Sequence, residues 1–229
     1  MITLLVDPGR FQGDQTIVED DAYRHLFRAR RAAVGDRLRV VDGEGRARWG
    51  EVAGVERRRA VVTLGADAPA NEPPYRLTLV VAALRPERAS WLVEKATEIG
   101  VAAVRFLASE RTPRQYGEAQ VERWRRVASA AVEQCHRSRR PAVSGVHGWG
   151  ELPELVADAR ERWFLDFQGG DLGAPHALAG VVLVGPEGGW SDAERAELER
   201  LGVASVALGP RVLRVETAAV VAAARLLLG

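Results

Sequence analysis

The chain has 229 residues, 47% of them hydrophobic, which allows one large domain or two small ones with packed cores. Its net charge of +1 gives no indication of a polyanionic binding partner. Its single cysteine, Cys135, excludes an internal disulfide and fits a protein of a reducing compartment. The N-terminus has no signal-peptide pattern, and no apolar run reaches membrane-spanning length. The histidines and the cysteine lack the spacing of metal ligands. We therefore expect a soluble, cytoplasmic protein with no metal and no membrane contact.

Short strands at close spacing dominate the first part of the chain. Residues 37–41 alternate in polarity and end in Asp42-Gly43-Glu44-Gly45, which predicts a hairpin. A short helix is predicted over residues 22–32, with an aspartate at 20 or 21 as its cap. The other predicted strands cover residues 1–6, 15–18, 46–55 and 60–64. This pattern favours a small β-barrel.

A linker separates this region from the rest of the chain. Residues 66–74 include the consecutive prolines Pro73 and Pro74, which stiffen the segment and exclude a helix. We place the domain boundary in this linker, with one domain over residues 1–72 and another over residues 73–229.

Strand and helix patterns alternate in the second domain. Residues 77–84 form a continuous apolar run, which is typical of a buried parallel strand. Helices are predicted at residues 87–99, with Gly100 after the last turn, and at residues 118–135 and 216–228. Further strands are predicted at residues 103–108, 142–146, 163–167, 181–184 and 204–208. The alternation predicts an α/β fold with a parallel sheet covered on both faces.

Two glycine-rich loops follow the last two predicted strands. The first begins at Gly185 (GPEGGWSDAE) and the second at Leu208 (LGPRVLRVETA), and each leads into a helix. Ser191 and Glu194 form a capping box, which marks the start of the first helix. In open α/β sheets ligands bind outside the carboxyl ends of the strands, and glycines let the backbone approach a ligand closely. The loops therefore predict a small-molecule site built mainly from backbone; the alternative is that they are only tight turns. The first loop, residues 185–189, matches neither a P-loop nor a dinucleotide fingerprint.

Charge is uneven along the chain although its total is balanced. Residues 105–140 carry nine arginines against four glutamates, which gives +5. Arginine suits phosphate because its planar fork binds two oxygens at once. For the arginines at 123–126, a solvated helix face with arginine–glutamate pairs is as good an interpretation as RNA contact. For Arg137, Arg139 and Arg140, in a loop after a helix, we favour RNA contact.

The two glycine loops, in this order and at this separation, resemble the family of small-subunit ribosomal RNA uridine-N3 methyltransferases (RsmE-like). Upstream matches are LVEKATEIGV from Leu92, SERT from Ser109, AVEQCHR from Ala131 and, more weakly, HLFRARRAAVGDRLRVVDGEG from His25. The resemblance covers nearly the whole chain. It implies a SPOUT-type α/β domain with a trefoil knot, preceded by a small PUA-like β-barrel that binds RNA. It also implies S-adenosyl-L-methionine as the cofactor, small-subunit ribosomal RNA as the substrate and a homodimer.

The resemblance also assigns residues to the cofactor site and to RNA. By the resemblance, Arg28, Arg30 and Arg31 of the first domain would contact RNA, in addition to Arg111, Arg137, Arg139 and Arg140 of the basic stretch described above. The chain departs from the family at Ala29-Arg30, where Val-Leu is usual, and at Val215, where Thr or Ala is frequent. The cofactor would be held by Leu165, Leu183, Gly185, Pro186, Glu187, Gly188, Leu208, Gly209, Arg211, Val212, Leu213, Arg214, Thr217 and Ala218.

Three residues are candidates for the chemistry at uridine N3. Arg214 would stabilise negative charge on the uracil ring as the N3 proton is lost. Glu187 and Glu216 are the carboxylates that would take this proton. Glu216 is also well explained as a first-turn acid of the last helix, and Arg214 as a ligand of a phosphate or of the cofactor carboxylate.

Two other functions stay open from the sequence. The same fold would serve a methyltransferase with another RNA target, either a ribose 2′-oxygen or another base. A non-catalytic RNA-binding factor in ribosome assembly would use the barrel and the arginines alone, but the intact glycine loops argue against it.

Overall fold

The computed structural model describes residues 1–11, 13–29, 31–111 and 115–229, and these form two compact units. The first unit comprises Met1–Glu72 and Ser129–Arg140, and the second comprises Pro73–Ala128 and Pro141–Gly229. Arg30, a predicted RNA contact, lies outside the described residues, and so does the side chain of Arg28. Within the described ranges, no helix is both long enough and apolar enough to cross a membrane.

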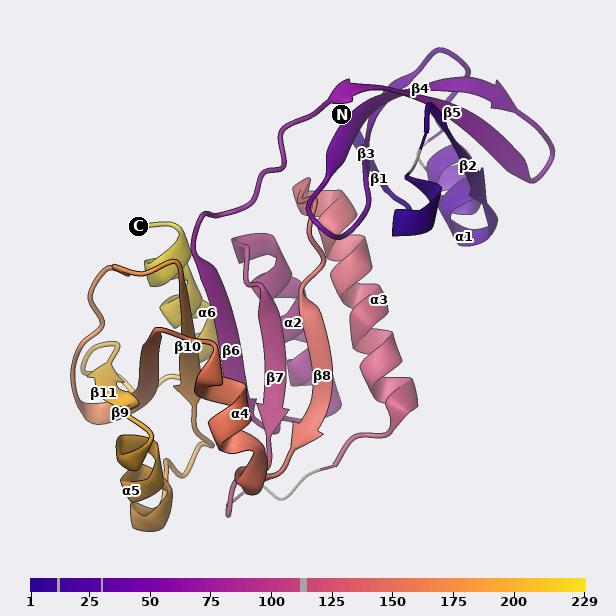
Figure 1. Ribbon diagram of the computed structural model, residues 1–229. Coiled ribbons are helices and arrows are strands. Elements are labelled where there is room, and N and C mark those ends of the chain that lie inside the picture. Colours follow the sequence, from indigo (N-terminus) through magenta and orange to yellow (C-terminus); the bar gives the residue numbers. More distant parts are fainter. Residues whose placement is uncertain (12, 30, 112–114) are drawn as a thin grey trace. The chain divides into compact units, whose positions relative to one another are not determined.

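A curled, mixed sheet of five strands forms the first unit (Figure 1). Its order is β1 (Ile2–Leu5), β3 (Arg37–Val41), β4 (Ala47–Val55), β5 (Arg59–Asp67) and β2 (Gln15–Glu19). β1 and β3 are parallel, whereas the other neighbours are antiparallel. Alternate strand residues such as Leu38, Val52 and Val62 point into a shared apolar core. The predicted strands are confirmed, and in the part of the chain that the structure describes no ladder joins β1 to β2.

The helix predicted over residues 22–32 is shorter and less regular than expected. α1 (Asp20–Tyr23) passes into a π-helical segment, η2 (Arg24–Ala29). Arg31 has a left-handed backbone conformation, with φ of 56°, which a helix cannot continue through. The prediction of a regular helix up to residue 32 was therefore wrong at its C-terminal end. A 3-10 turn, η1 (Pro8–Arg10), precedes β2.

Arg39 joins three separate segments inside the first unit. Its side chain is only 1% exposed although it is charged. The guanidinium donates to the carbonyl oxygens of Pro69 (2.5 and 3.1 Å), Ala70 (3.0 Å), His136 (2.9 Å) and Arg137 (3.2 Å). Burial lowers the pKa of Arg39 below its usual value. Since a buried cation is costly unless it is hydrogen-bonded, these carbonyls stabilise the charge and tie β3 to the linker and to the 129–140 segment.

The second unit contains a six-stranded sheet in which each neighbouring pair is parallel (Figure 1). Its order is β11 (Ala204–Ala207), β9 (Glu161–Asp171), β10 (Ala179–Val184), β6 (Arg76–Ala82), β7 (Ala103–Leu107) and β8 (Ala142–His147). The predicted α/β fold is confirmed, and the predicted strands differ from these mainly at their ends. Because the strands run in the same direction, their carboxyl ends share one edge of the sheet.

Helices cover both faces of this sheet. On β10, Val182 and Val184 belong to the core shared with α2, α3 and α6, whereas Val181 and Leu183 belong to the core shared with α4 and α5. The two-residue period of a strand produces this alternation, and burial on both faces explains the continuous apolar runs in the sequence. The helical elements are α2 (Pro86–Ile99), α3 (Glu118–Cys135), η3 (Trp149–Glu151), α4 (Leu152–Ala157), α5 (Asp192–Arg200) and α6 (Val215–Leu227).

Local signals predicted several helix ends correctly. The capping box of α5 is confirmed, because Ser191 Oγ accepts from Glu194 N (3.3 Å) and Glu194 Oε2 accepts from Ser191 N (2.8 Å). Gly100 ends α2 in a left-handed conformation with φ of 108°. α3 covers the predicted residues 118–135. The trefoil knot implied by the resemblance stays a prediction.

Candidate functional site

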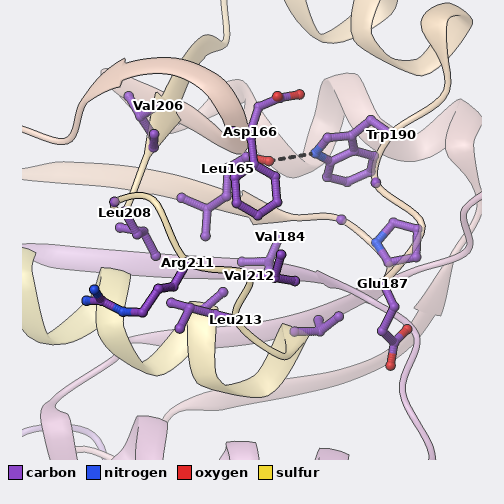
Figure 2. Close-up of a pocket in the computed structure, with 18 of the residues that line it drawn as sticks. Leu165, Asp166, Val184, Glu187, Trp190, Val206, Leu208, Arg211, Val212 and Leu213 are labelled. Atoms are coloured by element: carbon purple, nitrogen blue, oxygen red, sulfur yellow. Dashed lines mark hydrogen bonds between the residues drawn. The ribbon is translucent and has the colours of Figure 1, made fainter.

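A pocket lies at the carboxyl ends of β9, β10 and β11, and it contains about 730 Å³ of empty space, part of it open to solvent. β9 lies between β10 and β11 in the sheet, so the loops after β10 and β11 flank it. In Figure 2 the side chains of Leu165, Val184, Leu208 and Leu213 surround the middle of the pocket, with Trp190 at one side. The walls are therefore mainly apolar side chains and loop backbone.

Most cofactor residues predicted from the sequence line this pocket, but some lie elsewhere. Leu183 is fully buried in the core, and Gly188 faces the side chain of Arg111. Arg214 is exposed at the N-cap of α6, and Thr217 is half-buried in the first turn of that helix. The predicted residues that line the pocket are Leu165, Gly185, Pro186, Glu187, Leu208, Gly209, Arg211, Val212, Leu213 and Ala218. Further lining residues, not predicted, are Asp166, Phe167, Val184, Gly189, Trp190, Arg195, Val206, Ala207 and Val215.

A wide bulge in β9 supplies part of the wall. Phe164 pairs with Ser205 of β11, but the next pair is Gly170 with Val206, so residues 165–169 leave the ladder. A side chain at Gly169 would collide with the backbone of Val206, which explains the glycine at the base of the bulge. The only sequence signal for this feature is the Gly169-Gly170 pair, which weakens a regular strand.

Hydrogen bonds and an ion pair hold this bulge against the pocket. Trp190 Nε1 donates to the carbonyl oxygen of Leu165 (3.2 Å), as the dashed line in Figure 2 shows. The side chain of Asp166 is only 4% exposed and pairs with Arg195 of α5. Asp166 Oδ1 also accepts from the backbone N–H of Gln168 (3.1 Å). The bulge is thus fixed to the first glycine loop and to the helix that follows it.

Gly185 occupies the tightest position of the first glycine loop. A Cβ atom built there would lie 2.8 Å from the indole ring of Trp190, closer than real Cβ contacts. Trp190 is 3% exposed, packs against Trp149 with ring centroids 5.9 Å apart, and is held by its hydrogen bond to Leu165. The indole has little room to move away, so this position requires glycine.

The two candidate carboxylates share one arginine, Arg88, in the first turn of α2. Glu187 Oε1 lies 3.1 Å from Arg88 Nη1, and Glu216 Oε1 lies 3.6 Å from Arg88 Nε. The residue Glu216 is only 7% exposed, and its Oε2 atom is buried without a hydrogen-bond partner. The side chain of Glu187 is 60% exposed. Arg88 was not predicted from the sequence, because its partners lie about a hundred residues away along the chain.

Arg111 contacts the glycine loop of its own chain. Its Nη1 donates to the carbonyl oxygen of Gly188 and lies 3.5 Å from that of Gly189. The adjacent residue Glu110 donates its backbone N–H to Glu194 Oε1 (2.9 Å). The segment that begins with Ser109 is therefore held at the same edge of the sheet as the pocket.

The three arginines predicted in the 129–140 segment differ in their surroundings. Arg137 is 3% exposed and pairs with Glu72 (2.8 Å), so its guanidinium is occupied inside the first unit. This burial removes Arg137 from the expected phosphate contacts. Arg139 is half-buried beside Gly45, and Arg140 is exposed with its Nη1 3.3 Å from Ser129 Oγ. The prediction for this segment therefore rests on Arg139 and Arg140.

Potential metal ligands do not cluster in the part of the chain that the structure describes. Among these residues, no group of three or more histidine, cysteine or acidic side chains could hold a metal ion. Arg31, another predicted RNA contact, is exposed at its left-handed position after η2.

Comparison with known proteins places this architecture in a family. A model described as an RNA methyltransferase domain matches residues 71–227, and one described as an RNA methyltransferase PUA domain matches residues 18–65. The ribosomal RNA small subunit methyltransferase E of Mycobacterium bovis is 35% identical, over 92% of this chain and 85% of its own. The chain belongs to this methyltransferase E family. The Aquifex aeolicus member is 31% identical, over 91% of this chain and 92% of its own.

A solved structure of the family has the same fold. The ribosomal RNA small subunit methyltransferase E from Neisseria gonorrhoeae, bound to S-adenosyl methionine, matches with a TM-score of 0.87 and 26% identity. The match covers 98% of this chain and 95% of that chain. Family membership confirms the resemblance seen in the sequence, and the PUA match confirms the PUA-like character of the first region.

Proposed function

We propose that this chain is an S-adenosyl-L-methionine-dependent methyltransferase that methylates N3 of a uridine in small-subunit ribosomal RNA. The observation that carries the proposal is the pocket of two glycine loops at the carboxyl edge of the sheet, in a chain of the methyltransferase E family. The relative from Neisseria gonorrhoeae holds S-adenosyl methionine in this fold. A carboxylate with a free, buried oxygen lies at the start of the helix that follows the second loop.

The pocket residues fit this cofactor. Apolar side chains such as Leu165, Val184 and Leu208 suit the faces of an adenine ring, and the glycine loops bring backbone N–H and C=O groups to its polar edge. The cofactor supplies an electrophilic methyl group on a sulfonium. The protein must then align the two reactants, and alignment alone can lower a barrier by about 7–11 kcal/mol.

Glu216 is the residue that we assign to take the N3 proton. Its Oε2 is buried and has no hydrogen-bond partner, so it can accept one from a bound base. Glu216 lies in the first turn of α6, at the positive end of the helix, and its carboxylate is paired with Arg88. Glu187 is largely exposed, so it is less suited to transfer a proton in a site that excludes water.

Arg214 completes the proposed site. It is the N-cap residue of α6, two residues before Glu216, and its exposed side chain has no hydrogen bond or ion pair among the described residues. We assign it to stabilise negative charge on the uracil ring as N3 loses its proton. A phosphate contact of the same guanidinium is the alternative, and the two roles separate experimentally because only the first slows the chemical step.

We predict that Gly185→Ala weakens S-adenosyl-L-methionine binding. The added methyl group collides with the indole of Trp190 and distorts the pocket wall, and overpacking of this kind costs about 1–3 kcal/mol of folding stability. If the whole distortion opposes cofactor binding, the affinity falls by roughly 5–150-fold. Isothermal titration calorimetry on the folded variant measures the effect. The matched control is Gly173→Ala, because Gly173 has open space around the added atom and an ordinary backbone conformation. Wild-type cofactor affinity in the Gly185→Ala variant would show that the first glycine loop is not part of the cofactor site.

The domain roles follow the same proposal. Residues 1–72 belong to the PUA-like, RNA-binding domain, and residues 73–229 supply the methyltransferase domain except for Ser129–Arg140, which are part of the first unit. Arg31, Arg139 and Arg140 are accessible for phosphate contact in the first unit, as is Arg111 beside the first glycine loop.

The proposed working form is a homodimer in the cytoplasm, in which Arg111 of one subunit also serves its partner's site. A monomeric mass in light scattering at micromolar protein would contradict the dimer.

We predict that the double variant Arg139→Ala, Arg140→Ala weakens RNA binding and flattens its salt dependence. Each lost phosphate contact lowers the slope of log affinity against log salt by about 0.7 for a single strand, so two contacts give about 1.4. Filter binding of a ribosomal RNA fragment over a salt series measures this slope. The control variant Arg160→Ala, Arg200→Ala removes two exposed arginines of the second unit. Equal slopes in both variants would show that Arg139 and Arg140 form only a solvated surface.

One experiment tests the proposed function directly. Purified protein is incubated with labelled S-adenosyl-L-methionine and unmodified small subunits or their RNA, and the nucleosides are separated and identified. The proposal expects label in 3-methyluridine. Label in a 2′-O-methylated nucleoside or in another base would assign a different target, and cofactor binding without any label would support a non-catalytic role.

A further inference from the structure

Arg88 reaches the site from an element that contains neither glycine loop. It lies in the first turn of α2, the helix that packs against α6, and its side chain is 36% exposed. Two of its nitrogens face two different carboxylates, Nη1 toward Glu187 and Nε toward Glu216. One guanidinium therefore connects the first glycine loop with the helix that follows the second.

The two contacts differ in what they contribute. The pair with Glu187 is exposed, and such pairs stabilise little. Glu216 is 7% exposed, and no other cation is paired with its carboxylate among the described residues. A buried carboxylate depends strongly on its one partner, because removal of that partner leaves an uncompensated buried charge. The effect of Arg88 on the site should therefore act mainly through Glu216.

We propose that Arg88 is a positioning residue for the methyl-transfer reaction. Through Nε it holds Oε1 of Glu216, which leaves the second oxygen, Oε2, buried and free to receive the N3 proton of the substrate uridine. The exposed contact of Nη1 with Glu187 adds only a weak link to the Gly185–Gly189 loop. Arg88 itself makes no contact with the pocket lining other than Glu187 in the contacts described, so its role is exerted through the carboxylates. This inference rests on the proposed function and on Glu216 as the proton acceptor.

The test is a double-mutant cycle between Arg88 and Glu216, measured as the single-turnover rate at saturating cofactor and RNA. We expect Arg88→Ala to slow this rate by on the order of 10–100-fold, since a misplacement of about 1 Å can cost 10²-fold. Arg88→Lys should recover part of the rate, because it keeps the charge and loses the fork. In the Glu216→Gln background, Arg88→Ala should cause little further loss. The matched control is Lys95→Ala, which removes the cation that pairs with exposed glutamates of the same helix.

Thermal unfolding and the nucleoside analysis of the wild-type reaction separate the possible failures. Thermal unfolding of the cofactor-free variants should show the same coupling, with Arg88→Ala lowering the midpoint less when Glu216 is already glutamine. Arg88→Gln replaces Arg88→Ala if the alanine variant does not fold. Rate losses that multiply in the double variant, or an Arg88→Ala rate equal to wild type, would overturn the positioning role. Absence of 3-methyluridine from the wild-type reaction would instead show that the proposed function had failed.

Discussion

Glu216→Gln is expected to slow single-turnover methylation by about 10²–10⁴-fold, the usual contribution of a positioned proton acceptor. Glutamine has the same shape as glutamate but cannot take up the N3 proton. Because Glu216 is not among the residues that line the pocket, cofactor affinity should change little. The rate is measured with saturating S-adenosyl-L-methionine. The affinity for the cofactor is measured separately by calorimetry, and the affinity for RNA by filter binding.

The control for this variant is Glu154→Gln, which changes an exposed first-turn glutamate of α4 on the same domain. A wild-type rate in Glu216→Gln would show that Glu187 or solvent, and not Glu216, accepts the N3 proton. Arg214→Ala, measured in parallel, should reduce the rate as well as RNA affinity. If it reduces RNA affinity alone, Arg214 is a phosphate ligand and Glu216 acts without an electrostatic partner on the base.

Arg39→Met is expected to destabilise the protein by about 3–5 kcal/mol, because four carbonyl acceptors lose their donor and each buried acceptor left unsatisfied costs about 1–3 kcal/mol. Methionine fills much of the same volume, but the carbonyl oxygens of Pro69, Ala70, His136 and Arg137 lose their donor. If the chain unfolds in one transition, the midpoint of thermal unfolding should fall by roughly 6–20 °C.

The control for Arg39→Met is Arg37→Met, an exposed arginine two residues earlier on the same strand. It should shift the midpoint very little. Equal, small shifts in both variants would show that water satisfies the four carbonyls once the guanidinium is gone. Differential scanning calorimetry distinguishes these results and also shows whether the two units unfold together.

Local interactions allowed much of the fold to be predicted from the sequence. The Ser191–Glu194 capping box and the left-handed Gly100 each depend on neighbours within a few residues, and the structure confirms both. The strands of the parallel sheet were recognisable because burial on both faces demands continuous apolar runs. The helix predicted over residues 22–32 failed at its end, where Arg31 adopts a left-handed conformation that no sequence signal indicated.

The sequence by itself determined the strand and helix patterns of the two domains and the positions of the two glycine loops. Through the resemblance of these loops to a known family, it also determined the family. The tertiary structure alone decided which side chains meet at those loops. Arg88 reaches Glu187 and Glu216 from another helix, and the bulge of residues 165–169 forms only where β9 meets β11. Arg137, an exposed loop cation by sequence, is buried against Glu72, 65 positions away. Such contacts depend on strand order and packing across the whole chain, which local periodicity and spacing do not encode.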